Sequence, residues 1–280
     1  MKLTFHPALL MLVGCIASCS TVAEKEAPAK LLPAAGLGIN GVMILVKDLD
    51  SARNYYTSKL GFAMPRKFDK GLYSGTLSAY LSFADFSSLE LVGIEDSAQA
   101  SKDSGLTKTD SFIGAFVKEH EGARLYSIST SSVDTTGKWL RSQGFKTDTP
   151  QSGRVATEIP KGWDWDDGGP QWRNLAFNAN NPPAELPSFM EISGLPYQEI
   201  QEEWTPYAWR KYYRVHPNGV VGMSYLQIVV SDLKEARKKF KQIGLLELAA
   251  NDSTANFQIA NGHQLHLIEP RLTAKPINKT

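Results

Sequence analysis

A short sequence pattern occurs three times along this 280-residue chain, and it restricts the possible folds more than any other feature. Each copy has an apolar extended segment, a residue able to cap a helix, a stretch with helical periodicity and a glycine. Internal repetition of this kind indicates a duplicated supersecondary unit. The copies begin at Val42-Met43-Ile44-Leu45, Leu125-Tyr126-Ser127-Ile128 and Tyr225-Leu226-Gln227-Ile228.

The residues between each first strand and glycine predict a helix. The side chains at the expected helix starts can accept hydrogen bonds from free backbone amides. These are Asp48, Ser132 and Asp232. The glycines stand where a left-handed residue commonly ends a helix. They are Gly61, Gly144 and Gly244. Further extended segments follow each glycine, so every copy predicts a strand, a helix and about three strands.

The first copy carries a helix start of the form Lys-Asp-Leu-Asp-x-Ala-x-x-x-Tyr followed by Leu60-Gly61-Phe62. With the predicted element order, it resembles the vicinal oxygen chelate superfamily, which includes glyoxalase I, ring-cleaving dioxygenases and bleomycin-resistance binding proteins. The connector His216-Pro217-Asn218-Gly219 is similar to the glyoxalase-like branch. The resemblance implies an α+β fold of βαβββ modules, two of them paired into one cup and the third a half unit.

The same features divide the chain into segments. We call residues 39–94 module one, 124–194 module two and 222–270 module three, and the cup is the sheet face opposite the helices. Modules one and two form the paired unit 39–194, which includes a polar loop at 96–123. The remaining segments are a signal peptide (1–19), a flexible linker (20–38), an aromatic-rich connector (195–221) and a tail (271–280).

The N-terminus predicts a targeting segment, because a basic start precedes an apolar stretch too short to span a bilayer. Cys15 and Cys19 each follow a small residue and resemble the bacterial lipoprotein box, whose cysteine receives palmitate-type acyl chains. Cys19 is favoured because a polar tail follows it. Lipidation at Cys15 and a plain secretory signal are the alternatives. With Ser20 next to Cys19, the resemblance implies a lipid-anchored protein on the periplasmic face of the outer membrane.

Composition argues against several partners. The chain has 30 basic and 29 acidic side chains and no long basic run. This balance argues against nucleic acid as a partner and against electrostatic binding to a membrane, so membrane contact would come from the lipid. No cysteine lies in the predicted modules, which must therefore be held by their core rather than by disulfides.

Strand alternation predicts which side chains line the cup, because successive residues point to opposite faces of a sheet. It places Glu90 and Glu191, with Phe189, on the cup, and likewise Ser127 and Ser129. Two carboxylates facing one cavity repel and burial favours the neutral form, so one could act as acid or base. Alternatively, both are polar residues bonded to neighbouring strands.

The resemblance also implies positions for a metal. In metal-dependent relatives the first and last strands of paired modules each supply a ligand. The last-strand positions here are Glu90 and Glu191, whereas Gly41 and Leu125 at the first-strand positions have no donor. Two carboxylates hold a hard cation weakly. The sequence therefore predicts no tightly bound divalent metal, and the cofactor is unknown.

Module three has Tyr225 and His266 at the corresponding places, so these two could form a small polar site. His266 is accordingly a weak metal-ligand candidate beside the two glutamates. A lone half unit exposes an open face with an edge strand. Module three is therefore expected either to pack on the first two modules or to pair with its twin in a homodimer.

The segment 161–173 is the most unusual part of the sequence. Its side chains suggest flat apolar walls and a fixed cation for a carboxylate or phosphate. They are Trp163, Trp165, Trp172 and Arg173. The alternative is a hairpin connection, because Asp167-Gly168-Gly169-Pro170 favours a tight turn.

These observations predict a glyoxalase-like envelope protein that binds a small organic molecule in the cup. Lyase, isomerase or hydrolase chemistry by Glu90 and Glu191 is one extension of this prediction. A non-catalytic binding or sequestering protein, as in the resistance members, is the alternative from another class. A scaffold with a degenerate pocket is the third.

Overall fold

The computed structural model describes residues 31–33, 35–64, 66–71, 75–95, 116–154, 171–177, 185–193 and 215–270. The predicted lipidation residues Cys15 and Cys19 and the predicted wall residues Trp163 and Trp165 lie outside these ranges.

Within the described residues, each module has four strands and one main helix. Module one consists of β1 (Ala35–Leu45), α1 (Leu49–Asn54), the π-helical turn η1 (Tyr55–Lys59), β2 (Asp69–Lys70), β3 (Thr76–Ser82) and β4 (Ser88–Ile94). Module two consists of β5 (Gly122–Thr130), α4 (Val133–Ser142), β6 (Gln151–Arg154), β7 (Gln171–Leu175) and β8 (Ser188–Ser193). Module three consists of β9 (Tyr225–Val229), α7 (Leu233–Gln242), β10 (Leu246–Ala250), β11 (Thr254–Gln258), the 3₁₀ turn η2 (Ala260–Gly262) and β12 (Gln264–Ile268).

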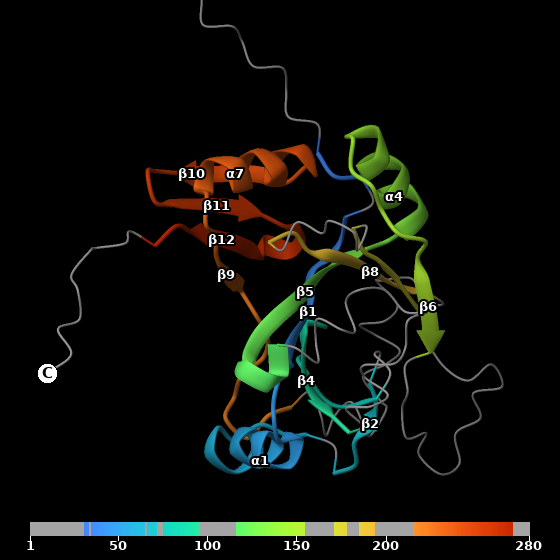
Figure 1. Ribbon diagram of the computed structural model, residues 1–280, viewed down its shortest axis with the longest axis vertical. Coiled ribbons are helices and arrows are strands. Elements are labelled where there is room, and N and C mark those ends of the chain that lie inside the picture. Colours follow the sequence, from blue (N-terminus) through green and yellow to red (C-terminus); the bar gives the residue numbers. More distant parts are fainter. Residues whose placement is uncertain are drawn as a thin grey trace, which may run out of the picture.

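The strands form two sheets (Figure 1). Modules one and two share an eight-stranded sheet of order β2-β3-β4-β1-β5-β8-β7-β6, and module three has a four-stranded sheet of order β10-β11-β12-β9. At the centre of the large sheet β1 and β5 are antiparallel, while β1 with β4 and β5 with β8 are parallel. The predicted α+β fold, with two paired βαβββ modules and a third half unit, is confirmed.

The repeated helix signals are confirmed at each end. Each N-cap side chain accepts a hydrogen bond from the backbone amide three residues later, at 2.9 Å for Asp48, 3.2 Å for Ser132 and 2.9 Å for Asp232. The three glycines have left-handed φ angles between 72° and 98°. In module one the helix continues from α1 into the π-helical turn η1.

The helices pack on one side of each sheet and form two main cores. Module one has its own cluster, which contains Leu49, Leu81 and Leu91. Modules two and three share a larger cluster, to which α4 contributes Leu140 and α7 contributes Phe240. The indole Nε1 of Trp139 on α4 also donates to the carbonyl of Ile243 after α7, at 2.9 Å. Module three therefore packs on module two through the helix side of its sheet.

The end of the connector is fixed against module one by His216. Its Nδ1 accepts from the Ala63 amide at 3.1 Å, and its ring packs edge-on against Phe62 and Phe83. Burial lowers the pKa of His216, so the ring is held neutral as an acceptor. This contact sets where β9 begins relative to the large sheet.

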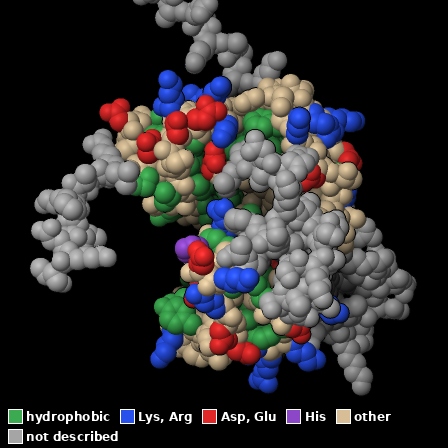
Figure 2. All heavy atoms as spheres, in the orientation of Figure 1, with side chains coloured by type: hydrophobic (Ala, Val, Ile, Leu, Met, Phe, Trp, Pro, Cys, Tyr) green, Lys and Arg blue, Asp and Glu red, His purple; other side chains and the backbone are tan. Residues whose placement is uncertain are grey.

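The visible surface carries both signs of charge. Figure 2 shows basic and acidic side chains interspersed over α7 and around α1. None of the helices within the described residues is both long and apolar enough to cross a membrane.

Candidate functional site

Glu90 lies on the cup face of module one. It sits on β4, directly opposite Met43 on β1 and Tyr80 on β3. Met43 belongs to a small apolar cluster on this face, together with Leu45 and Val92. Since paired residues share a face, Tyr80 also points into the cup. The predicted cup position of Glu90 is confirmed.

Burial makes the Glu90 carboxyl a weaker acid than usual. It raises the pKa of Glu90, and the facing hydroxyls of Tyr80 and Ser78 only partly oppose this effect. The pKa of the Tyr80 hydroxyl is held well above its ordinary value, first by burial and then by the Glu90 carboxylate. The Tyr80 residue as a whole nevertheless keeps 37% of its surface exposed, so it lies at the border between the cup and the solvent. Glu90 and Tyr80 thus form a pair of titratable groups with raised pKa values beside an apolar wall.

Three buried polar atoms on the cup face have no hydrogen-bond partner among the described residues. They are Glu90 Oε1, Ser78 Oγ and Asn174 Oδ1. Ser78 lies two residues before Tyr80 on β3, and Asn174 on β7 pairs with Met190 of β8. Buried polar atoms are normally bonded, so each unbonded one calls for an explanation. Both halves of the large sheet contribute such atoms to the same face.

The prediction that Glu191 faces the cup is wrong, because its side chain lies on the helix side of the sheet. On β8, Phe189 is fully buried in the core shared with α4, so odd-numbered residues of this strand face the helix. Glu191 follows the same alternation. Its Oε2 accepts from the amide of Val133, the first residue of α4, at 2.8 Å. Glu90 and Glu191 therefore lie on opposite faces of the large sheet and do not form a carboxylate pair.

Glu191 has a counterpart in module three rather than in module one. Glu269, which follows β12, accepts from the amide of Leu233 at the start of α7, also at 2.8 Å. Negative charge at a helix N-terminus is favourable because the free amides and the helix dipole are positive there. In module one the same place is taken by Gly93, where an added Cβ would lie 3.0 Å from Leu49 Cβ. The glutamate is thus a helix cap in two of the three modules.

Arg173 also lies on the helix side of the sheet, in contrast to its predicted role. It pairs with Glu191 across β7 and β8. Its guanidinium donates to both carboxylate oxygens of Asp134 on α4, at 2.8 and 2.9 Å. The ion pair lowers the pKa of Asp134. Arg173 is therefore engaged by α4 and does not reach into the cup.

The other predicted wall and floor residues that the structure describes do face the cup. Trp172 pairs with Ile192 on the cup side, and its ring covers Gly153 of β6, where a side chain would collide with it. Ser127 and Ser129 on β5 are buried. Ser127 Oγ accepts from the amide group of Asn40 at 3.0 Å.

The residues present do not fit the metal site that the resemblance implies. The strand registers place Ser188, not Glu191, at the module-two position equivalent to Glu90, beside Gly41 and Leu125 at the first-strand positions. One carboxylate and one hydroxyl are a poor set of ligands for a divalent ion. Within the described ranges no three His, Cys, Asp or Glu side chains come together. Of the weak candidates, Glu90, Glu191 and His266 lie in three separate places.

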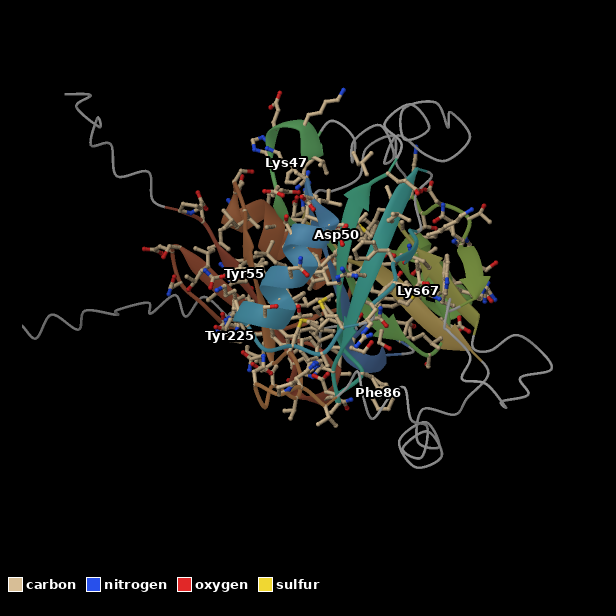
Figure 3. All side chains as sticks on the ribbon, turned by 90° about the horizontal axis from the view of Figure 1, so that it is seen from below. Lys47, Asp50, Tyr55, Lys67, Phe86 and Tyr225 are labelled. Carbon is tan, nitrogen blue, oxygen red and sulfur yellow. The ribbon has the colours of Figure 1, made fainter. Side chains whose placement is uncertain are left out.

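In module three the predicted proximity of Tyr225 and His266 is confirmed. Their rings stack with centroids 4.6 Å apart, and His266 Nε2 lies 2.9 Å from Gln264 Oε1. Tyr225 is 52% exposed. In Figure 3 it lies on the side of the molecule away from the olive strands of module two. This pair therefore sits on an open sheet face and not in a formed cavity.

Sequence reasoning missed three cup residues: Ser78, Tyr80 and Asn174. The segment Leu77-Ser78-Ala79-Tyr80-Leu81 alternates strictly between apolar and polar positions, which is the signal of a strand with one face on a core. Applied to this middle strand, the same alternation identifies Ser78 and Tyr80.

A cavity of about 340 Å³ lies elsewhere, on the helix side of module one. It is lined by the residues 47–50 at the start of α1, by Phe68 and Leu77, and by 93–95. Figure 3 shows Lys47 and Asp50 at this end of α1. It does not include Glu90.

The geometry agrees with comparisons to known proteins. A family model described as a glyoxalase-like domain matches residues 42–244, and the chain belongs to this family. A comparison with curated proteins gives no match.

Among solved structures, the chain is similar to a hypothetical protein from Staphylococcus aureus, with 13% identity, a TM-score of 0.61, and 83% of this chain and 86% of that one covered. It also matches methylmalonyl-CoA epimerase from Mycobacterium tuberculosis, with 18% identity, a TM-score of 0.41, and 61% and 96% covered. The likeness to the Staphylococcus aureus protein is one of fold.

Proposed function

We propose that the protein binds a small organic molecule in the cup, where it meets the carboxyl group of Glu90. The observation that carries the proposal is a set of buried atoms on this face that have no hydrogen-bond partner in the described part of the chain, Glu90 Oε1, Ser78 Oγ and Asn174 Oδ1. Small-molecule sites are usually apolar with a few convergent polar groups. Met43, Val92 and Trp172 supply apolar surface of this kind.

The charge state of Glu90 indicates the class of ligand. Because burial raises its pKa, the carboxyl keeps its proton to a higher pH than an exposed glutamate, and in that form it donates a hydrogen bond. Tyr80 is a second hydroxyl donor beside it. We therefore infer a ligand with an acceptor oxygen, such as a carbonyl or hydroxyl group. Reaction chemistry would use Glu90 as the acid, without the carboxylate partner that Glu191 was expected to provide.

The test begins with native mass spectrometry of the protein purified from its own envelope, which identifies any small molecule that it carries. Binding of that molecule is then measured for Glu90→Gln and Tyr80→Phe, with Glu95→Gln as control because Glu95 is exposed just after the same strand. Loss of a hydrogen bond should weaken binding in Tyr80→Phe by about two- to tenfold. Unchanged affinity in both cup variants would contradict the proposal.

Glu90→Gln also separates the two function classes. Glutamine keeps hydrogen-bonding capacity but cannot transfer a proton. Binding that persists while turnover is lost would favour an enzyme. Binding by the native protein without turnover would favour the sequestering class.

Metal content is expected to be below one ion per chain after ordinary purification, because Gly41, Leu125 and Ser188 stand at three of the four implied ligand positions. Elemental analysis of the untagged protein measures it. One tightly held zinc, nickel or iron per chain would contradict this expectation.

We also propose that the chain is lipid-anchored at Cys19, with Cys15 as the alternative, on the periplasmic face of the outer membrane. The support is the sequence pattern alone. Several acyl chains on one residue bind membranes much more durably than one chain. The intact mass of the mature N-terminus tests this, and an unmodified first residue would contradict it.

A further inference from the structure

Among the described residues, one edge strand of module three has no partner on its outer side. Of the described strands, only β12 pairs with β9, and β9 ends the small sheet (Figure 1). The Gln264 amide donates to the Ser224 carbonyl and the Val230 amide to the Ile268 carbonyl. In a parallel ladder the groups of alternate residues point to the same side. The backbone groups of Ser224, Leu226, Ile228 and Val230 therefore point to β12, and those of Tyr225, Gln227 and Val229 point outward.

The side chains of the three residues whose backbone groups point outward are also exposed to solvent. Tyr225 is 52% and Val229 67% exposed, and Gln227 between them is exposed as well. A strand edge with unpaired amides and exposed apolar side chains is a site for pairing with another strand. The remaining question is which strand would fit it.

The centre of the large sheet shows how two modules of this kind join. β1 is equivalent to β5 and β9, because each first strand leads into a helix with an N-cap residue, and positions are matched by counting back from Asp48, Ser132 and Asp232. Gly41 then corresponds to Leu125, Val42 to Tyr126 and Met43 to Ser127. In the antiparallel register, Gly41 pairs with Ser127, Val42 with Tyr126 and Met43 with Leu125.

This register is unchanged when the two modules are exchanged. The middle pair, Val42 and Tyr126, joins equivalent positions of the two modules. The two flanking pairs join the same two positions, with the roles of the modules exchanged. An arrangement with this property fits two identical modules related by a two-fold axis. In module three the equivalent pairs are Leu226 with Leu226 of a second copy, and Tyr225 with Gln227 of a second copy.

We propose that two copies of this chain associate through β9 in this register and so form a second cup, which neither copy contains alone. The two small sheets become one eight-stranded sheet, and each copy contributes its Tyr225 and His266 to the shared concave face. This inference concerns module three and does not depend on ligand binding at Glu90.

The test uses the full chain carrying Cys15→Ser and Cys19→Ser, studied by sedimentation equilibrium. A dimer is expected. Gln227→Pro removes an outward amide while leaving every β9–β12 hydrogen bond, so association should weaken by roughly tenfold or more, since the bond is lost once in each copy. Gln227→Ala keeps the amide and should remain dimeric.

A second variant fixes the register. Leu226→Cys places a thiol at the self-paired position, where antiparallel Cα atoms approach to about 4.5 Å. Mild oxidation should join two chains, whereas Leu248→Cys on the far strand β10 should not. A monomer at all concentrations would overturn the proposal. A dimer that Gln227→Pro leaves intact and Leu226→Cys does not cross-link would also overturn it. If Gln227→Pro does not fold, the cross-link alone decides.

Discussion

The large and small sheets contain the same unit, but the face opposite the helices is buried in one and open in the other. Leu45 in β1 is fully buried, whereas Val229, at the same position of β9, is 67% exposed. Both residues are apolar and both follow the same strand pattern. The difference shows that burial of the cup face comes from what surrounds a module and not from the module itself.

The largest expected effect tests this comparison directly. Leu45→Ala should destabilise the protein by about 2–5 kcal/mol, because it leaves a cavity among Met43, Val92 and Val117. Val229→Ala should change stability by no more than about 0.5 kcal/mol in the monomer. Urea unfolding of both variants measures the contrast. Similar losses at the two positions would mean that the small sheet is covered after all.

The second prediction concerns pH and the buried carboxyl. Because the folded state raises the pKa of Glu90, the folded protein holds a proton that the unfolded chain releases. Stability is therefore expected to fall as pH rises above the ordinary glutamate value of 4.5, by at most about 1.4 kcal/mol per pH unit. Glu90→Gln should remove this loss. Glu95→Gln serves as the control, and an identical pH dependence in wild type and Glu90→Gln would refute the burial of the acid.

The smallest expected effect compares the two helix caps. Glu191→Ala and Glu269→Ala should each destabilise by about 1 kcal/mol, because each leaves the first amide of a helix without its acceptor. The equal role predicts equal losses from thermal unfolding. Ligand affinity in the cup should be unaffected by Glu191→Ala, and a strong loss of affinity would restore Glu191 to the binding site.

The sequence predicted the fold well because local signals, the N-caps and the left-handed glycines, mark the helix ends in each module. Which side chains face the cup was harder to predict. In β12, Leu265 and Leu267 alternate with polar residues, and the predicted faces are correct. In β8, Phe189-Met190-Glu191-Ile192 has apolar residues at both phases, so periodicity does not fix the face. A slip of one residue transfers every side chain to the other side of a sheet.

The similar sequence positions of Glu90 and Glu191 therefore do not correspond to similar places in the fold. Glu191 instead corresponds to Glu269, which makes the same contact with a helix start. Glu191 and Glu269 each stand directly after an apolar residue that ends the ladder with the first strand, Met190 and Ile268. Only the structure shows that this position faces the helix start. The wrong face predicted for Arg173 has the same cause, because Arg173 pairs with Glu191 across β7 and β8 and shares its face.

The sheet and the core divide the chain in different ways. Hydrogen bonds across β1 and β5 join modules one and two, whereas the apolar cluster around Phe240 and Leu140 joins modules two and three. Proteins open locally in cooperative units, and regions with fewer buried apolar contacts open at lower free energy. In native-state hydrogen exchange we therefore expect the backbone amides of α4 and α7 to exchange with similar opening free energies. Module one, with its separate core, should open at lower free energy even though it shares a sheet with module two.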